Sequence, residues 1–484
     1  MLFQKNKLNI YNVSQYFHNI DDFKQMDIVG KNNKKYKLCF LDSLVNIEML
    51  DRVVLLQILN QKDSSIKSKC GHLDYKEVNN LEVAVKEILN GCTLLCDCEI
   101  GKYLLVNVQN QVGRSITESE QETVIYGPKE SFVEDIRTNL LLIRKRIKTS
   151  NLKNESFTLG SLSQTKVQLL YVEGIVNDNI LQELRYKIKS VNHDMFLNNS
   201  DLTSFLDENT YSLFPQYQIT DRPDVIASSL ASGKLAVLME GTPFAIIAPS
   251  TFLEFFQSPE DYIQRWPIAT FLRFLRFLSF PIAFLLVPLY VGITTHNYEM
   301  LPVYLLNILI VDRLDVPFPP LYEALFMIIV IEIIKDSSLR MPSKTGQTLG
   351  IIGGIVIGQV AIETGIVSKV LVIFIALSTL ASFLVPNYLM TQSTKLLQIF
   401  FVFLSGLYGV LGIIFGVIVL LIHLNSLESL TISYLSPLSP LNFNDWNDSI
   451  VKAPIQSLNT RPNYLNPRVK ERERLVKNSD RKKT

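Results

Sequence analysis

The residues with the clearest chemical potential lie in an apolar, glycine-rich stretch between Arg340 and Pro386. Two polar side chains, Gln359 and Glu363, stand there four residues apart, which is about one helical turn. A carboxylate at membrane depth is costly and normally faces a partner or water. Rings of carboxylates are a common means of favouring cations in channels. The stretch therefore predicts either a seam for helix packing or the lining of a hydrated path.

The glycines of this stretch are compatible with both roles. Gly346, Gly350, Gly354 and Gly358 recur every four residues, so they share one face of a helix. In water each would cost roughly 1 kcal/mol relative to alanine, whereas in a bilayer this spacing lets a second helix approach closely. Packing and pore lining can coexist in an oligomer. The pore or gating candidates are Gly350, Gly354, Gly358, Gln359 and Glu363.

Other reactive residue types predict little chemistry. Three cysteines suggest a metal site, but no histidine lies nearby at ligand spacing, and their run is typical of a strand: Cys92, Cys96 and Cys98. Four acidic residues end predicted strands and are interpreted as turn residues: Asp42, Asp97, Glu173 and Glu240. No nucleophile–base pair, P-loop or dinucleotide motif accompanies them. We therefore expect no catalytic residue, no metal, no cofactor and no enzymatic activity.

Composition divides the chain into a polar part and an apolar part. The 484 residues carry a formal net charge of +1, which gives no reason to expect a nucleic-acid partner. From Phe271 to Leu424 the chain is mostly apolar. The N-terminus lacks the apolar region of a signal peptide, so the N-terminal part is expected in the cytoplasm with reduced thiols.

The polar part repeats a strand followed by a helix. A strand at 36–45 precedes a helix at 46–59, and a strand at 167–176 precedes a helix at 177–188. Each predicted helix begins at an asparagine that can cap it.

A second pair of segments repeats in the same way. Helices at 81–91 and 223–233 each end in glycine and are followed by predicted hairpins at 92–108 and 235–248. The sequence therefore predicts two related α/β subdomains in tandem, followed by an α-helical multi-pass membrane domain.

The predicted organisation has six parts. They are a flexible arm (1–35), a first α/β subdomain (36–130), a linker helix with a polar segment (131–160), a second α/β subdomain (161–264), a transmembrane domain (265–425) and a cytoplasmic basic tail (426–484).

Hydropathy and charge predict the spans. A spanning helix needs about 20 apolar residues, and basic loops stay cytoplasmic. Because the 335–344 loop and the tail are basic, we prefer four full spans, near 274–294, 319–334, 370–385 and 396–424. The segments 301–311 and 348–366 would then be partial insertions. Six spans would account for all the apolar runs but agree less well with the rule that basic loops are cytoplasmic.

Charged residues near these segments are candidates for assembly or coupling. Arg273 and Arg276 share a helix face and are expected to reach lipid headgroups. Asp221 is expected to cap the helix after it, with Asp224 in a capping box, which leaves Arg222 for packing or a salt bridge. The full set is Arg222, Asp224, Arg273, Arg276, Glu323, Glu332 and Arg340.

Taken together, the motifs resemble the A subunit of the bacterial spore germinant receptors, the GerA family. The matching segments are DRPDV (221–225), EGTP (240–243), SPEDY (258–262), LRFLR (272–276), PLY (288–290), VPFPPLYEA (316–324), RMPSKTGQTLGIIGG (340–354) and IVIGQVAIETGIVS (355–368). The chain departs from the family pattern at Asp221, at Glu240, at 335–337 and at Ser433, where the family usually has proline.

The resemblance implies a subunit of the spore inner membrane, and the apolar runs and basic segments predict that it is multi-pass with both termini in the cytoplasm. It implies two partners, a transporter-like B subunit that binds the germinant and a lipoprotein C subunit, and homo-oligomers that form a cation channel. Two alternatives stay open: a non-conducting scaffold or signal-transducing subunit, and a secondary transporter. A transporter usually has repeats within its membrane part, whereas the repeat here is in the polar part.

Overall fold

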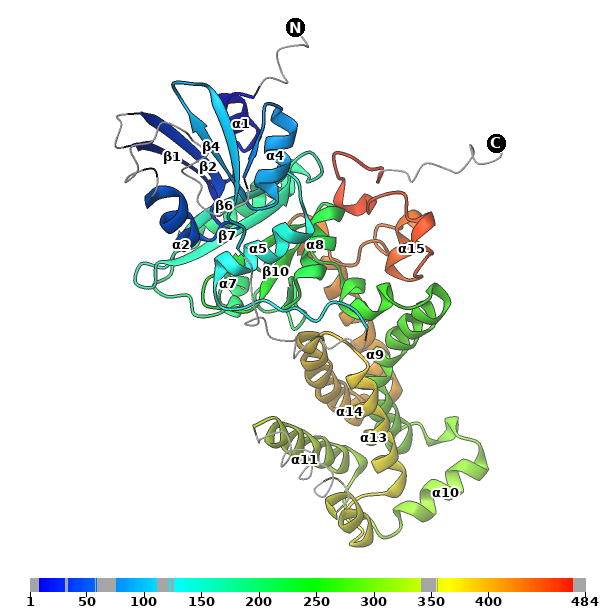
Figure 1. Ribbon diagram of the computed structural model, residues 1–484. Coiled ribbons are helices and arrows are strands. Elements are labelled where there is room, and N and C mark those ends of the chain that lie inside the picture. The colour runs from blue at the N-terminus through cyan, green and yellow to red at the C-terminus, as the bar shows by residue number, and fades with distance from the viewer. Residues whose placement is uncertain are drawn as a thin grey trace.

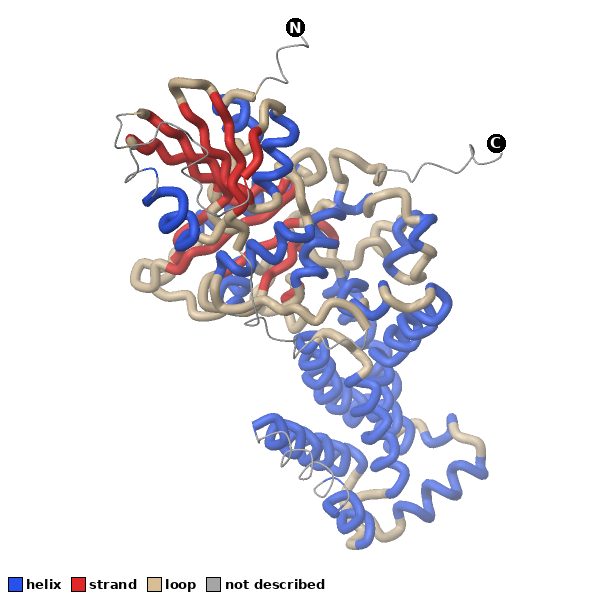
Figure 2. Tube along the Cα trace, viewed as in Figure 1, coloured by secondary structure: helices blue, strands red, loops and turns tan. Residues whose placement is uncertain are grey.

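The computed structural model describes residues 8–30, 34–56, 58, 75–110, 122, 126–340, 354 and 356–472. All described strands except one short hairpin lie in two sheets at one end of the molecule, and the long helices extend from the other end (Figures 1 and 2).

The first unit is a five-stranded sheet with the order β1-β2-β4-β5-β3 and antiparallel pairing throughout. Its strands are β1 (Phe23–Val29), β2 (Lys35–Leu41), β3 (Tyr75–Glu77), β4 (Cys92–Asp97) and β5 (Lys102–Asn107). Successive strand residues point to opposite faces. One face packs on α1 (Ile10–Tyr16) and α4 (Leu81–Leu89). The other packs on the π-helix Leu50–Leu55, which continues α2 (Ile47–Met49).

The second unit has the equivalent strand order, β6-β7-β9-β10-β8, again antiparallel. Its strands are β6 (Leu152–Leu159), β7 (Thr165–Val172), β8 (Gln218–Thr220), β9 (Leu235–Met239) and β10 (Ala245–Ala248). One face packs on α6 (Asp178–Ser190) and α7 (Asn199–Leu206). The other packs on α5 (Ile136–Arg146) and α8 (Pro223–Ser232).

Local signals behind the predicted repeat are confirmed. The side chain of Asn46 accepts a hydrogen bond from the Met49 amide, and that of Asn177 accepts from the Asn179 amide, each at 3.0 Å. Gly233 ends α8 with φ +100°, a conformation that favours glycine. The two units thus share their strand order and their capping chemistry.

Two expectations about the polar part are wrong. The segment expected as a loose arm forms α1 and β1; Val13 and Phe17 of this segment are buried in the first core. Its sparse apolar residues are spaced for a helix, and β1 reads as polar because it is an exposed edge strand. The segment expected as a linker contributes α5 and β6 to the second unit. The domain boundaries themselves remain a prediction.

The helical part is built from α9 (Trp266–Thr295), α10 (Val303–Arg313), α11 (Pro320–Arg340), α13 (Lys369–Phe383) and α14 (Tyr388–Ser426). Within the described residues, α9 and α14 have the length and apolar composition needed to cross a membrane. The helix α13 has 15 residues, which corresponds to about 22 Å. In Figure 1, α10 and α11 lie toward the end away from the sheets.

The helix α14 is a hairpin of two arms. Its backbone leaves the helical region at Gly409, with φ 62° and ψ −145°. A side chain at Gly416 would contact Phe401, although fifteen residues of continuous helix would separate the two by about 22 Å. The arms 388–408 and 410–426 therefore run antiparallel, and the prediction of a single span at 396–424 is wrong.

The bundle consequently has a proximal end beside the second unit and a distal end at Gly409. The helix α11 runs between them. Near its start, the Ser368 amide donates to Glu323. Farther along, the Lys335 ammonium lies 5.5 Å from the centre of the Phe383 ring, close to the proximal end. The segment expected as a partial insertion at 301–311 forms α10, and 356–363 is helical, while 348–353 lies outside the described residues.

The segment after α14 folds back onto the second unit. It contains a short hairpin of β11 (Glu428–Ser429) and β12 (Ile432–Ser433), and then α15 (Trp446–Ser449). Leu430, Ile432 and Leu465 are buried in the core of the second unit. The expectation of a separate tail from 426 is therefore wrong as far as residue 472.

Candidate functional site

The junction between the sheets and the bundle starts with the turn Pro259–Tyr262, which leads into α9. Ser258 caps this turn, and the Asp261 carboxylate accepts from the Ser258 amide at 3.3 Å, which makes a capping box. Asp261 is 1% exposed. The local sequence therefore holds one carboxylate in a fixed, buried position at the start of the bundle.

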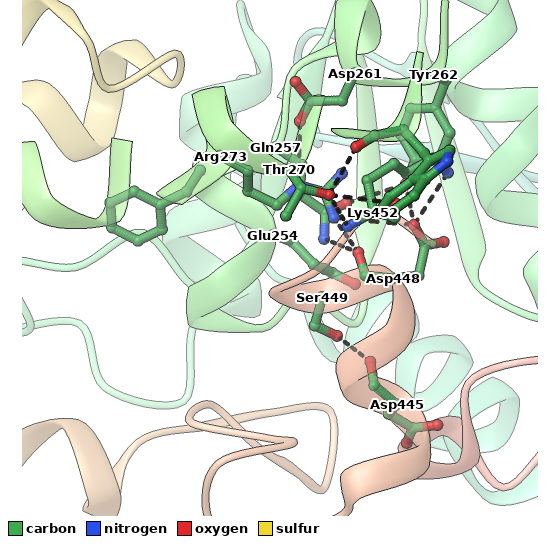
Figure 3. Close-up of polar contacts among 12 residues, drawn as sticks. Glu254, Gln257, Asp261, Tyr262, Thr270, Arg273, Asp445, Asp448, Ser449 and Lys452 are labelled. Atoms are coloured by element: carbon green, nitrogen blue, oxygen red, sulfur yellow. Dashed lines mark hydrogen bonds and ion pairs between the residues drawn. The ribbon is translucent and has the colours of Figure 1, made fainter. Parts of the chain in front are cut away.

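Two arginines of α9 share this carboxylate, and Figure 3 shows one of them, Arg273, near Asp261. Arg273 Nε donates to one oxygen of Asp261 at 3.2 Å, and Arg276 Nη1 donates to the other at 2.7 Å. Arg273 is fully buried. The expectation that both arginines reach lipid headgroups is therefore wrong, because a buried carboxylate and main-chain oxygens bind them instead.

Residues from α15 and the loop after it complete this cluster. Arg273 Nη1 donates to the main-chain oxygen of Asp448. Lys452 Nζ lies 3.2 Å from the Asp448 carboxylate and 3.6 Å from the centre of the Tyr262 ring. Burial lowers the pKa of Lys452, and the Asp448 carboxylate opposes that effect. We call Asp261, Tyr262, Arg273, Arg276, Asp448 and Lys452 the clasp.

The clasp joins the turn at the end of the second unit and the adjoining helix α9 to the folded-back segment, which is distant from both in sequence. Buried ion pairs contribute little net stability, but removal of one partner leaves an uncompensated charge and costs about 3–5 kcal/mol. The clasp therefore constrains how the second unit sits on α9. Sequence reasoning missed Asp448 and Lys452, because they lie about 175 residues from Arg273 and no local pattern marks them.

An apolar contact lies beside the clasp. Phe214, from the loop between α7 and β8, is buried against residues of both arms of α14. The Ser212 hydroxyl lies 3.1 Å from His423 Nε2 in the second arm, and the Ser393 hydroxyl of the first arm donates to the Leu213 main-chain oxygen. A movement of this loop would therefore act on both arms.

Arg222 and Asp224 form a separate buried contact. The Arg222 guanidinium binds the Asp224 carboxylate at 3.1 and 2.8 Å. It also donates to the main-chain oxygens of Glu122 at 3.1 Å and Pro128 at 2.9 Å. Arg222 itself occupies the N-cap position of α8, so the expected capping roles of Asp221 and Asp224 are wrong. The contact holds the chain before α5 against α8.

The remaining charged candidates lie along α11. Glu323 is buried and pairs with Arg313 at 3.1 Å, which ties the start of α11 to the end of α10. Glu332 lies 3.9 Å from Lys395 Nζ in the first arm of α14. Arg340 forms an exposed pair with Asp336 at 3.0 Å. The structure therefore does not bring these three together with the clasp.

Within the glycine-rich stretch, the polar pair and one glycine are exposed. Gln359 Nε2 donates to Glu363 at 2.8 Å, and both side chains are exposed. A Cβ atom at Gly354 or Gly358 would have no neighbour within 4 Å among the described residues. Gly350 lies outside the described residues. Gln359 and Glu363 therefore form a hydrogen-bonded pair. The glycine face beside them, Gly354 and Gly358, is not covered by described residues of the same chain.

Three cysteines of the first unit, Cys39, Cys92 and Cys96, have little nucleophilic character. The strand predicted for Cys92–Asp97 is β4. Burial raises the pKa of Cys39 to about 12 and of Cys92 and Cys96 to about 11. Thiolates are therefore scarce there at neutral pH.

Comparison with known proteins identifies the family. The profile described as Bacillus/Clostridium GerA spore germination protein matches residues 11–464. The chain belongs to the GerA family. Spore germination protein GerQA of Bacillus cereus is 37% identical over 98% of this chain and 97% of its own length.

Two further comparisons have lower coverage. Spore germination protein A1 of Bacillus subtilis (strain 168) is 35% identical over 70% of each chain. The crystal structure of the N-terminal domain of the A subunit of the Bacillus megaterium spore germinant receptor GerK3 covers 50% of this chain and 94% of its own, with 26% identity and a TM-score of 0.39.

Proposed function

We propose that this GerA family member is the A subunit of a spore germinant receptor, and that it couples a cytoplasmic sensing part to an ion path in the spore inner membrane. Membership of the family and the relatives named as spore germination proteins support the role in germination. The clasp and the Phe214 contact support the coupling, because both join the second unit to the bundle.

The helices favour six crossings over the four that we predicted from charge. The helix α9 runs from the proximal to the distal end, and α11 runs back. Gly365 lies beside Asp315 at the distal side, whereas α11 ends at Arg340 toward the proximal side, so these two described positions stand at opposite ends of the bundle and we count one further crossing between them. The helix α13 and the two arms of α14 add three more. An even number keeps the sheet units and the folded-back segment on one side, which we assign to the cytoplasm.

One observation supports the ion-path proposal: some glycines of the bundle are packed against the same chain, whereas others have no described neighbour. Gly292, Gly406 and Gly416 would each place a Cβ atom within 3.1 Å of residues of the same chain. Gly354 and Gly358 have open space instead. Because closely spaced glycines favour helix association in a bilayer, we infer that a second copy covers this face and that Gln359 and Glu363 border water. Oligomerisation, a transporter-like B subunit and a lipoprotein C subunit are parts of this proposal.

Conductance tests the proposal. The purified full-length chain is reconstituted in planar bilayers, and cation current is measured for the unmodified chain and for Glu363→Gln. A cation-selective current that Glu363→Gln reduces is expected. An intact receptor complex without any current through this subunit would favour the alternative of a non-conducting scaffold or signal-transducing subunit.

A further inference from the structure

A cavity of about 460 Å³ lies next to the clasp. Its walls come from α8, from the turn that precedes α9, and from residues 444–472 of the folded-back segment. Asn387, which caps the first arm of α14, also borders it. This volume is in the range of small-molecule sites, about 300–1,000 Å³.

Hydroxyl and amide groups face this cavity from both sides. Ser228, Ser229 and Ser232 follow one face of α8. Asn447 and Thr460 border the cavity from the folded-back segment. Such groups both donate and accept hydrogen bonds, so they suit a ligand that carries hydroxyl groups.

Two arginines of the lining have only neutral partners among the described residues. Arg461 donates to the main-chain oxygens of Ala231 at 2.9 Å and Val469 at 3.0 Å. Arg472 Nη2 donates to the Ser232 hydroxyl at 3.2 Å. Partial burial and the charge of Arg472 lower the pKa of Arg461. Two cations held near each other without a described acidic partner favour an anion between them.

The acidic residues of the lining are already occupied. Asp224 pairs with Arg222, Glu254 pairs with Lys234 at 2.5 Å, and Asp448 pairs with Lys452. Asp445 accepts from the main-chain amides of Asn463 and Tyr464 at 2.9 and 3.1 Å. Burial raises the pKa of Glu122 to about 7, so it carries only part of its negative charge at neutral pH. Asp224, Glu254 and Asp448 are therefore each balanced by a cation, whereas Asp445 and the partly charged Glu122 offset the two charges of Arg461 and Arg472 only in part.

We propose that this cavity binds a small hydroxylated anion, phosphorylated or carboxylated, whose anionic group lies on Arg461 and Arg472 and whose hydroxyl groups bind the serines of α8. The bound anion contacts three segments that meet at the clasp, so it stabilises their arrangement. Any effect of this anion on ion release rests on the proposed function, whereas its binding does not.

Binding is tested with the full-length chain in nanodiscs of phosphatidylcholine. Glycerol 3-phosphate is the probe, and glycerol is the uncharged control at the same ionic strength. Thermal unfolding and titration calorimetry are expected to show saturable binding of glycerol 3-phosphate and none of glycerol. Each charge-assisted hydrogen bond contributes about 1.5–3 kcal/mol, so Arg461→Gln and Arg472→Gln should each weaken binding by about tenfold or more.

Matched variants make the outcome decisive. Arg468→Gln changes an arginine of the same segment that pairs with Asp178 and does not line the cavity, so its affinity should equal that of the unmodified chain. Ser229→Leu places an apolar side chain in the cavity and should weaken binding while both arginines remain. Stabilisation by phosphatidylglycerol in the nanodiscs, lost in Arg461→Gln, would assign the anion to a lipid headgroup. Binding unchanged in Arg461→Gln and Arg472→Gln, or no binding of either anion, would overturn the proposal.

Discussion

A carboxylate shared by two arginines is the most consequential residue-scale feature. Asp261 is buried, and its two oxygens bind Arg273 and Arg276 separately. An exposed ion pair is worth at most about 1 kcal/mol, because water solvates both partners when it breaks. Asp261 and Arg273 are fully buried and Arg276 is largely so, so the loss of one charge leaves the others uncompensated.

Asp261→Asn should therefore lower the free energy of unfolding by about 3 kcal/mol, because an amide cannot balance two guanidinium groups. Thermal unfolding of the purified protein measures the effect. The control is Asp336→Asn, which removes an exposed pair with Arg340 and should change stability by no more than about 0.5 kcal/mol. Equal effects of the two variants would show that the clasp contributes nothing specific.

Arg222→Ala should reduce the amount of folded, assembled protein, because the oxygens of Glu122 and Pro128 lose their shared donor. Arg222→Lys should recover it only in part, since an ammonium cannot reproduce the bidentate contact with Asp224. Immunoblots of receptor level, together with germination dose–response curves, separate assembly from ligand affinity. Normal levels with a shifted dose–response would contradict this assignment.

Residue chemistry was predictable where it is local. The caps Asn46 and Asn177 and the helix stop at Gly233 each depend on neighbours within a few residues. The partners of Arg273 were not predictable, because Asp448 becomes a neighbour only through the fold. Sequence alone therefore predicted that Arg273 and Arg276 bind lipid headgroups, whereas in the structure both bind the buried Asp261 carboxylate.

At the scale of elements, hydropathy measures how apolar a segment is but carries no direction. Both arms of α14 are apolar, so the segment 396–424 reads as one long span although it turns back at Gly409. The edge strand β1 was not predicted, because its side chains are mostly exposed and polar and its sequence resembles that of a loop. The strands β4 and β10, buried and bounded by turns, were predicted with their observed limits.

Gly409→Ala should break the hairpin, because φ 62° with ψ −145° is essentially restricted to glycine and costs about 1–3 kcal/mol for other residues. An added Cβ atom would also collide with His296 and Asn297. Thermal unfolding is expected to shift downward. Gly358→Ala, a glycine with open space, is the matched control and should leave stability unchanged or slightly raised. A tolerated Gly409→Ala would contradict the turn.

The folded-back segment should be required for the second unit. A chain that ends at Ser426 loses Leu430, Ile432 and Leu465 from the core, and each such side chain contributes about 1.5–3 kcal/mol on burial. We expect this truncation to abolish protease-resistant protein. A chain that ends at Arg472 retains all three and should fold normally. Folding of the shorter chain would show that the second unit does not need the folded-back segment for its stability.

At the scale of the whole molecule, the two ends of the bundle differ in what they are bound to. The proximal end is tied to the second unit through the clasp and Phe214. No described residue of the same chain lies within 4 Å of a Cβ atom at Gly354 or Gly358. A change in the sheet units can thus reach the bundle directly, whereas the glycine face is available to another copy.

This arrangement separates two substitutions that would otherwise look alike. Gly354→Leu should leave the fold of a single chain intact, since there is space for the side chain, but should block close approach of a second copy.

Glu363→Gln should leave both the fold and the oligomer intact, yet lower cation release several-fold, because a carboxylate ring that favours cations is lost. Thermal unfolding, cross-linked oligomer and cation release are measured for each variant, with cysteine substitutions along 356–363 to map the positions that water-soluble thiol reagents reach. Protection of the cysteines at both 359 and 363, with full cation release from Glu363→Gln, would mean that this face only packs and that ions cross elsewhere.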